Sequence, residues 1–148
     1  MHLFWSRGTE HTRDLDVLLE PLRPHAELLE ARFGRATGRD PYLDLVLAGL
    51  PVLPVGWRAR AVQFSGPWVA LSVHRLQTAD QIASKLRSFR PQDRRDIQLL
   101  CDMQPEVYAP LASLSDADFW TAPDWWEDRI APHRDRVLKY LRGELAEL

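Results

Sequence analysis

The chain has 148 residues, 45% of them hydrophobic and 27% charged, and a formal net charge of -2. These values are those of a globular domain with one core, and they exclude a strongly basic field over the whole surface. The only cysteine, Cys101, excludes a disulfide framework or a cysteine zinc cluster within the chain. No segment approaches the ~18 apolar residues of a membrane span, so we expect a cytoplasmic protein with no membrane partner.

Two strands and a helix are expected in the first third of the chain. Leu15–Leu19 is apolar and is followed by Glu20 and Pro21, which favours a strand. Arg23–Gly34 has apolar residues at helical spacing and a glycine at its end, as a helix would. Arg39–Pro51 contains a second strand, followed by a loop rich in glycine and proline.

The middle of the chain predicts a strand pair and then two helices. Arg58–Phe64 and Trp68–Leu76 flank a Ser-Gly-Pro turn, so we expect neighbouring antiparallel strands. One helix is expected from Thr78 as N-cap, with Gln81 as its capping-box partner. A second begins at Pro91 and places its apolar residues on a buried face, namely Ile97, Leu100 and Cys101.

The last third differs in composition from the rest. Gln104–Pro132 is predicted to be a loop, and its aromatic pairs Phe119-Trp120 and Trp125-Trp126 are interpreted as covering the edge of a core. Ile130–Leu148 has the apolar spacing of an amphipathic helix. We therefore predict a core over residues 1–103 and, over residues 104–148, a segment that packs on this core or on a partner.

Two aspartates open the first strand. Residues two apart on a strand share a face, so Asp14 and Asp16 lie together, opposite Leu15 and Val17. Asp44 interrupts the apolar alternation of the second strand. If the two strands are neighbours, the three carboxylates repel one another and need a metal or protonation, and such a set suits magnesium and two-metal nucleotidyl transfer. The alternative is that Asp14 caps a turn and Asp44 lies on a solvated face.

Four motifs follow one another between Gly8 and Cys101. They are T-x-D-L-D at the first strand, a later strand aspartate, the loop G-L-x-x-L-P-x-G-W, and K-L followed by R-x-x-D-x-x-D. In this order they resemble the minimal nucleotidyltransferase-fold proteins of bacteria, in the branch similar to abortive-infection toxins. The resemblance implies an α+β nucleotidyltransferase (polymerase-beta-like) fold, with a small mixed sheet flanked by helices.

The resemblance also implies an activity. This is the Mg-dependent transfer of a nucleoside monophosphate from an NTP to a hydroxyl of RNA, protein or a small molecule, with two Mg²⁺ ions when NTP is bound. It makes Asp14, Asp16 and Asp44 metal ligands, and Asp44 also the residue that helps activate the nucleophile. Lys85 matches the family's lysine and would bind the nucleotide.

The residues around Lys85 leave its role open. A contact with the triphosphate and a structural ion pair fit its position on the helix equally well. Asp93 is expected to neutralise Lys85 or Arg90, or to cap its helix. Asp96 is expected to lie on the flank of that helix and to be more ordinary than Asp93.

One part of the family pattern is absent from the written sequence. Active members carry a Gly-Ser or Gly-Gly element before the D-x-D strand, whose backbone N–H groups hold phosphates. Here the residues before Asp14 include Ser6 and Gly8 but not that order. Either the true start of the chain lies upstream, or this is a shortened member that does not hold a triphosphate in the usual way. The alternative function is therefore a catalytically impaired module that acts in protein interaction, with a partner or a second copy, or as a toxin–antitoxin component.

Overall fold

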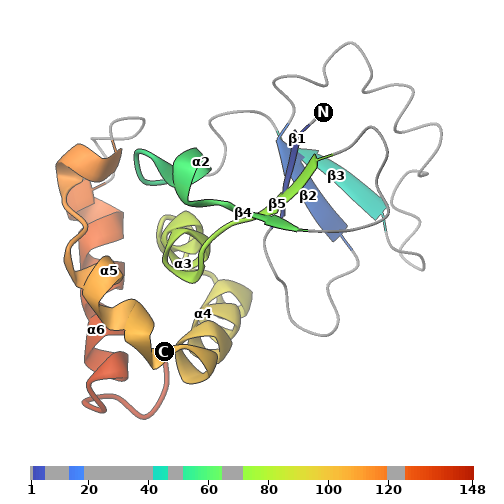
Figure 1. Ribbon diagram of the computed structural model, residues 1–148. Coiled ribbons are helices and arrows are strands. Elements are labelled where there is room, and N and C mark those ends of the chain that lie inside the picture. Colours follow the sequence, from blue (N-terminus) through green and yellow to red (C-terminus); the bar gives the residue numbers. More distant parts are fainter. Residues whose placement is uncertain (1, 6–13, 19–41, 47–51, 65–71, 120–125) are drawn as a thin grey trace. The chain divides into compact units, whose positions relative to one another are not determined.

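The computed structural model describes residues 2–5, 14–18, 42–46, 52–64, 72–119 and 126–148 (Figure 1). The chain forms two units, one of residues 1–50 with 60–76 and the other of residues 51–59 with 77–148. For the strands among the first 50 residues we describe backbone pairing and register. The helix predicted over Arg23–Gly34 lies outside the described residues.

The described residues of the first unit form five short strands. They are β1 (His2–Trp5), β2 (Asp14–Leu18), β3 (Tyr42–Val46), β4 (Val62–Phe64) and β5 (Ser72–Arg75). One sheet has the order β1-β5-β4, in which β1 runs parallel and β4 antiparallel to β5. The other sheet is the parallel pair β2-β3. Helices and small sheets of mixed pairing are thus both present.

The strand predictions hold in their main features. Strands occur in both of the aspartate-containing segments, and β4 and β5 pair antiparallel. Strand β1 was not predicted. Its register pairs His2 with Ser72, so its partner lies far along the chain, and a local sequence pattern carries no signal for such a parallel pairing.

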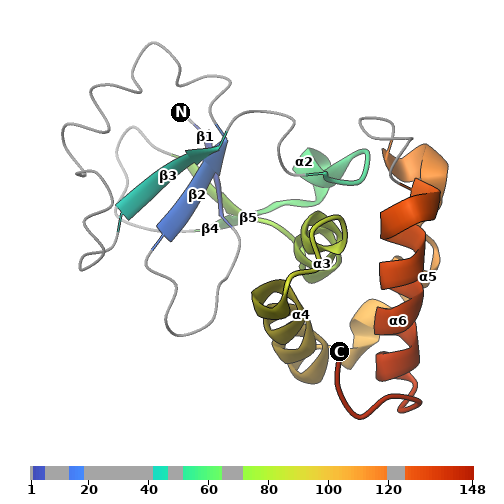
Figure 2. The same cartoon turned by 180° about the vertical axis from the view of Figure 1, so that it is seen from behind.

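The second unit is helical. Its longer helices are α3 (Thr78–Leu86), α4 (Pro91–Met103) and α6 (Ala131–Leu141). The shorter helices are α2 (Trp57–Arg60), the 3-10 helix η2 (Pro105–Val107), α5 (Tyr108–Ala112), the 3-10 helix η3 (Asp116–Phe119) and the π-helix η5 (Trp126–Ile130). Figures 1 and 2 both show α5 beside α6. None of the helices described is long and apolar enough to cross a membrane.

The core of the second unit joins α3 and α4 to the C-terminal helices. Ile82 and Leu86 of α3 and Ile97 of α4 are fully buried, as the predicted apolar spacing requires. Later elements add side chains that are equally buried, namely Leu111, Phe119, Ile130 and Val137. Each such side chain contributes roughly 1.5–3 kcal/mol by leaving water. Residues on both sides of position 103 therefore share one core.

The predicted loop over Gln104–Pro132 is wrong, because this segment contains α5, two 3-10 helices and a π-helix. Its prolines indicated breaks, but Pro105 stands in the first turn of a helix, where it lacks no needed N–H. The structural interpretation of the aromatics holds where they are described. Phe119 is buried, and its ring centroid lies 5.5 Å from that of Trp126. Trp120 and Trp125 lie outside the described residues.

Two helix ends also differ from prediction. Gln77, not Thr78, is the N-cap of α3, because the Thr78 hydroxyl donates to Oε1 of Gln104 instead of capping the helix. The last helix ends at Leu141 and does not continue to Leu148. Gly143 follows with a φ of 74°, and a glycine in this left-handed conformation is a common helix stop.

Candidate functional site

The two aspartate-containing strands are direct neighbours. In the parallel pair β2-β3, Asp16 is the register partner of Asp44, and Asp14 is the partner of Tyr42. The three predicted acidic residues thus occupy two adjacent strands, with two of them at directly paired positions. The sequence predicted this juxtaposition only on the condition that the two strands are neighbours, and the backbone pairing shows that they are.

The apolar pattern accounts for this register. It pairs Leu15 with Leu43 and Val17 with Leu45, so apolar positions match apolar positions along both strands. A slip by one residue would pair aspartate positions with leucine positions and move each strand's apolar set to the other face. Residues 19–41 join the strands and are long enough for the crossover of roughly a dozen residues that a parallel pair requires.

Pairing Asp16 with Asp44 has an electrostatic consequence. Like charges at directly paired positions of a sheet are destabilising, and carboxylate oxygens are the ligands that Mg²⁺ prefers. The donor set therefore fits a hard cation. Elsewhere, among side chains that the structure describes, no group of three or more His, Cys, Asp or Glu residues could hold a metal.

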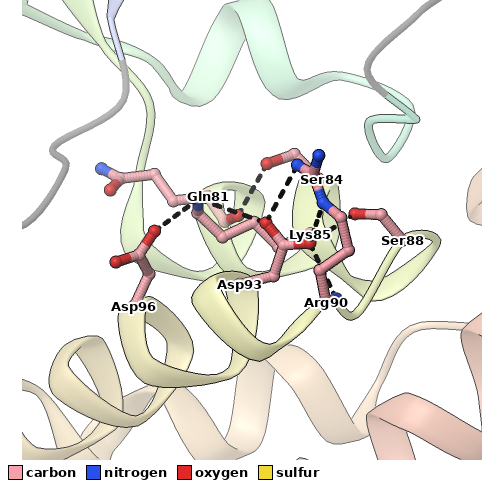
Figure 3. A network of polar contacts seen from close by, with 7 residues as sticks. All are labelled: Gln81, Ser84, Lys85, Ser88, Arg90, Asp93 and Asp96. Carbon is pink, nitrogen blue, oxygen red and sulfur yellow. Dashed lines mark hydrogen bonds and ion pairs between the residues drawn. The ribbon is translucent and has the colours of Figure 1, made fainter. Parts of the chain in front are cut away.

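The second group of predicted residues lies in the helical unit, where Lys85 of α3 points toward α4 (Figure 3). Its Nζ is 2.9 Å from Oδ2 of Asp96 and 4.0 Å from Oδ1 of Asp93. The side chain of Lys85 is 21% exposed, whereas those of Asp93 and Asp96 are 5% and 7% exposed. Of the two roles predicted for Lys85, the ion pair is present, and the contact with a triphosphate stays a prediction.

Asp93 caps the start of α4 and neutralises Arg90, as predicted. Its Oδ2 accepts hydrogen bonds from the Arg90 backbone N–H at 2.9 Å, from Arg90 Nε at 3.0 Å and from the Ser88 hydroxyl at 2.8 Å. Burial alone would raise the pKa of Asp93, but these hydrogen bonds and the charge of Arg90 outweigh it, so the pKa lies below its ordinary value. The same contact raises the pKa of Arg90.

The prediction for Asp96 is wrong. Asp96 is buried and forms the shorter ion pair with Lys85, instead of lying on the helix flank. Asp93 and Asp96 are three residues apart on α4 and therefore share the helix face that meets Lys85. The spacing R-x-x-D-x-x-D contained a signal for this ion pair. It places both aspartates on one helix face, so that a lysine on the preceding helix can pair with the second aspartate as well as the first.

Cys101 lies on the buried face of α4, as the sequence predicted. Its side chain is buried on α4, and burial together with the charge of Asp102 raises the pKa of its thiol to about 12. The thiolate is thus scarce at neutral pH. Ser6 and Gly8, which bear on the missing phosphate-binding element, lie outside the described residues.

Residues 4–101 match the family model described as "Nucleotidyltransferase of unknown function (DUF6036)". The chain belongs to this nucleotidyltransferase family. The matched residues run from β1 into α4 and include Asp14, Asp16, Asp44 and Lys85. No curated protein and no solved structure matches the chain. The nucleotidyltransferase resemblance is confirmed, and the likeness to abortive-infection toxins stays a prediction.

Proposed function

We propose that this protein is a Mg-dependent nucleotidyltransferase that transfers a nucleoside monophosphate from an NTP to a hydroxyl acceptor. The observation that carries the proposal is the register pairing of Asp16 with Asp44, in a chain whose family is that of nucleotidyltransferases. A purely structural sheet has no need of two like charges at paired positions. The proposal includes the polymerase-beta-like arrangement of the strands that carry them.

Asp14, Asp16 and Asp44 are the residues that would hold magnesium. When bound, Mg²⁺ neutralises triphosphate charge and stabilises the attacking and leaving oxygens. Asp44 would also accept the proton of the acceptor hydroxyl. In the overall reaction a bond forms between that oxygen and the α-phosphorus, the bond to the bridging oxygen breaks, and pyrophosphate leaves.

Lys85 is assigned to nucleotide binding by the family resemblance. Its ammonium is already paired with Asp96, so a triphosphate would have to share or replace that partner. This predicts that Lys85→Met raises the KM for NTP. Asp96→Asn, which keeps the lysine and weakens only its carboxylate partner, should leave the KM unchanged or lower it.

The proposal is tested with purified protein, Mg²⁺ and each of the four NTPs labelled at the α-phosphate. We expect pyrophosphate release and transfer of the label to a component of an RNA, protein or small-molecule fraction. Asp16→Asn and Asp44→Asn keep side-chain size and should each lower the rate at least ~100-fold, since each removes a proposed ligand. The matched control is Asp128→Asn, which changes an exposed aspartate of η5.

Full activity of Asp16→Asn would reject the assigned site. If neither pyrophosphate release nor a shift of Tm with NTP and Mg²⁺ occurs, and the protein instead captures a stoichiometric partner, the noncatalytic interaction module is the better reading. A metal-dependent shift of Tm that Asp16→Asn abolishes would favour the enzyme, even before its acceptor is found.

A further inference from the structure

Positive charge is concentrated where α3 meets α4. The twelve residues Lys85–Asp96 read KLRSFRPQDRRD and contain five basic and two acidic residues, in a chain whose net charge is -2. Four of the basic residues are arginines, which we call the basic turn. They are Arg87, Arg90, Arg94 and Arg95.

The two acidic residues of this segment offset only two of its five basic charges. Asp93 and Asp96 are both buried, and their charges are matched by Arg90 and Lys85. By contrast, the side chains of Arg94 and Arg95 make no ion pair or hydrogen bond within the described parts of the chain. The surface of the basic turn is therefore cationic without a nearby exposed carboxylate in the same segment.

The arrangement of these arginines indicates an extended anion. Arg90 and Arg94 are four residues apart and share one side of the start of α4, whereas Arg95 lies about 100° further around the helix axis. The arginines are thus spread over more than one helical turn instead of converging on one point. Guanidinium groups bind phosphate oxygens in a fork, and the positive end of the α4 dipole lies at the same place.

We infer that the basic turn binds the phosphodiester backbone of nucleic acid. A chain of phosphates matches a spread of arginines better than a single phosphate group does, and backbone contacts need no base recognition. This binding requires neither NTP nor metal and so stands apart from the transfer reaction. That RNA is then the acceptor among RNA, protein and small molecules is an extension that rests on the proposed function.

The test measures fluorescence anisotropy of a labelled RNA of about 20 nucleotides, without NTP and with EDTA, over a series of salt concentrations. The double variant Arg94→Gln/Arg95→Gln should bind about ten-fold more weakly or worse at ~50 mM salt. Its plot of log affinity against log salt should lose about 1.4 in slope, because each lost phosphate contact on a single strand contributes about 0.7. Glutamine keeps the helix propensity of arginine.

The matched control is Arg136→Gln/Lys139→Gln, which removes the same charge from exposed residues of α6. We expect its affinity to stay within about three-fold of the wild type, because these charges lie outside the basic turn and act on it only through the screened field. An equal loss in both double variants would overturn the proposal in favour of net charge. Absence of wild-type binding at low salt would overturn it as well.

A third arm separates a nucleic-acid surface from a triphosphate site. ATP at the same phosphate concentration should not displace the RNA, whereas unlabelled single-stranded DNA of the same sequence should compete, since the backbone is what is read. Displacement by ATP alone would overturn the proposal. If the double variant melts at a lower temperature, Arg95→Gln, at an exposed position, replaces it and should show about half the change in salt slope.

Discussion

Asp16 and Asp44 are register partners in the parallel pair β2-β3. Two aspartate positions are thus paired in strands of only five residues each, so few other residue pairs in this sheet can offset their repulsion. Like charges at such positions weaken a sheet by up to about 1 kcal/mol. If the proposed Mg²⁺ binds at these positions, it would remove this cost, and the stability of the sheet would then depend on the metal.

This link gives the first prediction. Asp16→Asn should increase the free energy of unfolding by about 0.2–1 kcal/mol in EDTA, because it removes one of two like charges. Mg²⁺ should raise the Tm of the wild type and leave that of Asp16→Asn unchanged. Thermal melts with and without Mg²⁺ measure both effects, with Asp128→Asn as the control. A variant that is less stable than the wild type in EDTA contradicts the assumed repulsion.

The Lys85–Asp96 pair gives the second prediction. Lys85→Met leaves the buried Asp96 carboxylate without its closest cation, at 7% exposure. We expect a loss of about 1–3 kcal/mol, below the ~3–5 kcal/mol of fully buried pairs, because Lys85 itself reaches water. Urea denaturation measures this loss. The double variant Lys85→Met/Asp96→Asn should recover most of it, and failure to do so would show that the loss is one of packing.

Asp93 gives the third prediction, which concerns pH. Its pKa in the folded protein lies below the ordinary value. The folded state therefore holds this proton less tightly than the unfolded state, so Asp93 stabilises the fold above its unfolded pKa, near 4. That contribution disappears as the pH falls through the folded pKa. The stability difference between wild type and Asp93→Asn should thus stay constant above about pH 5 and shrink as the pH falls below about 4, as denaturation at each pH would show.

Phe89 gives the fourth prediction. It has a φ of 44°, a left-handed conformation, yet its ring is buried and stacks on His133 at a centroid distance of 4.2 Å. Replacing the ring costs about 3–5 kcal/mol, while glycine recovers roughly 1–2 kcal/mol of backbone strain. Phe89→Gly should therefore lower stability by about 1–4 kcal/mol.

Alanine is the matched comparison at this position, because it also removes the ring but keeps the unfavourable φ. We expect Phe89→Ala to be less stable than Phe89→Gly by about 1 kcal/mol. Chemical denaturation of both variants measures the difference. Equal stability of the two would show that the backbone relaxes out of the left-handed region once the ring is gone.

The parts of the fold that the sequence predicted are those with a local period. Alternating residues identified the strands around Asp16 and Asp44, and helical spacing identified the buried face of α4 with Ile97 and Cys101. The shared face of Asp14 and Asp16 follows from a spacing of two. Their proximity to Asp44 required the two strands to be neighbours. Residues 19–41 separate these strands in the chain, and the pattern of neither strand alone encodes that they pair.

The missed features depend on distant partners. Strand β1 exists through its pairing with β5, and Thr78 leaves the capping position because Gln104 accepts its hydroxyl hydrogen. Asp96 appeared ordinary on its own helix, and its role emerges only when Lys85 approaches from α3. When the sequence is analysed one segment at a time, it reveals only one of the two partners in each of these contacts.

The family match stops at Cys101, yet α4 continues to Met103 and the same core takes in Phe119, Ile130 and Val137. The family match thus covers a shorter part of the chain than the core does. A fragment trimmed to residues 4–101 would expose the apolar sides of α3 and α4 to water and should aggregate. Experiments on fragments of this protein therefore need boundaries that include the whole core and not only the family match.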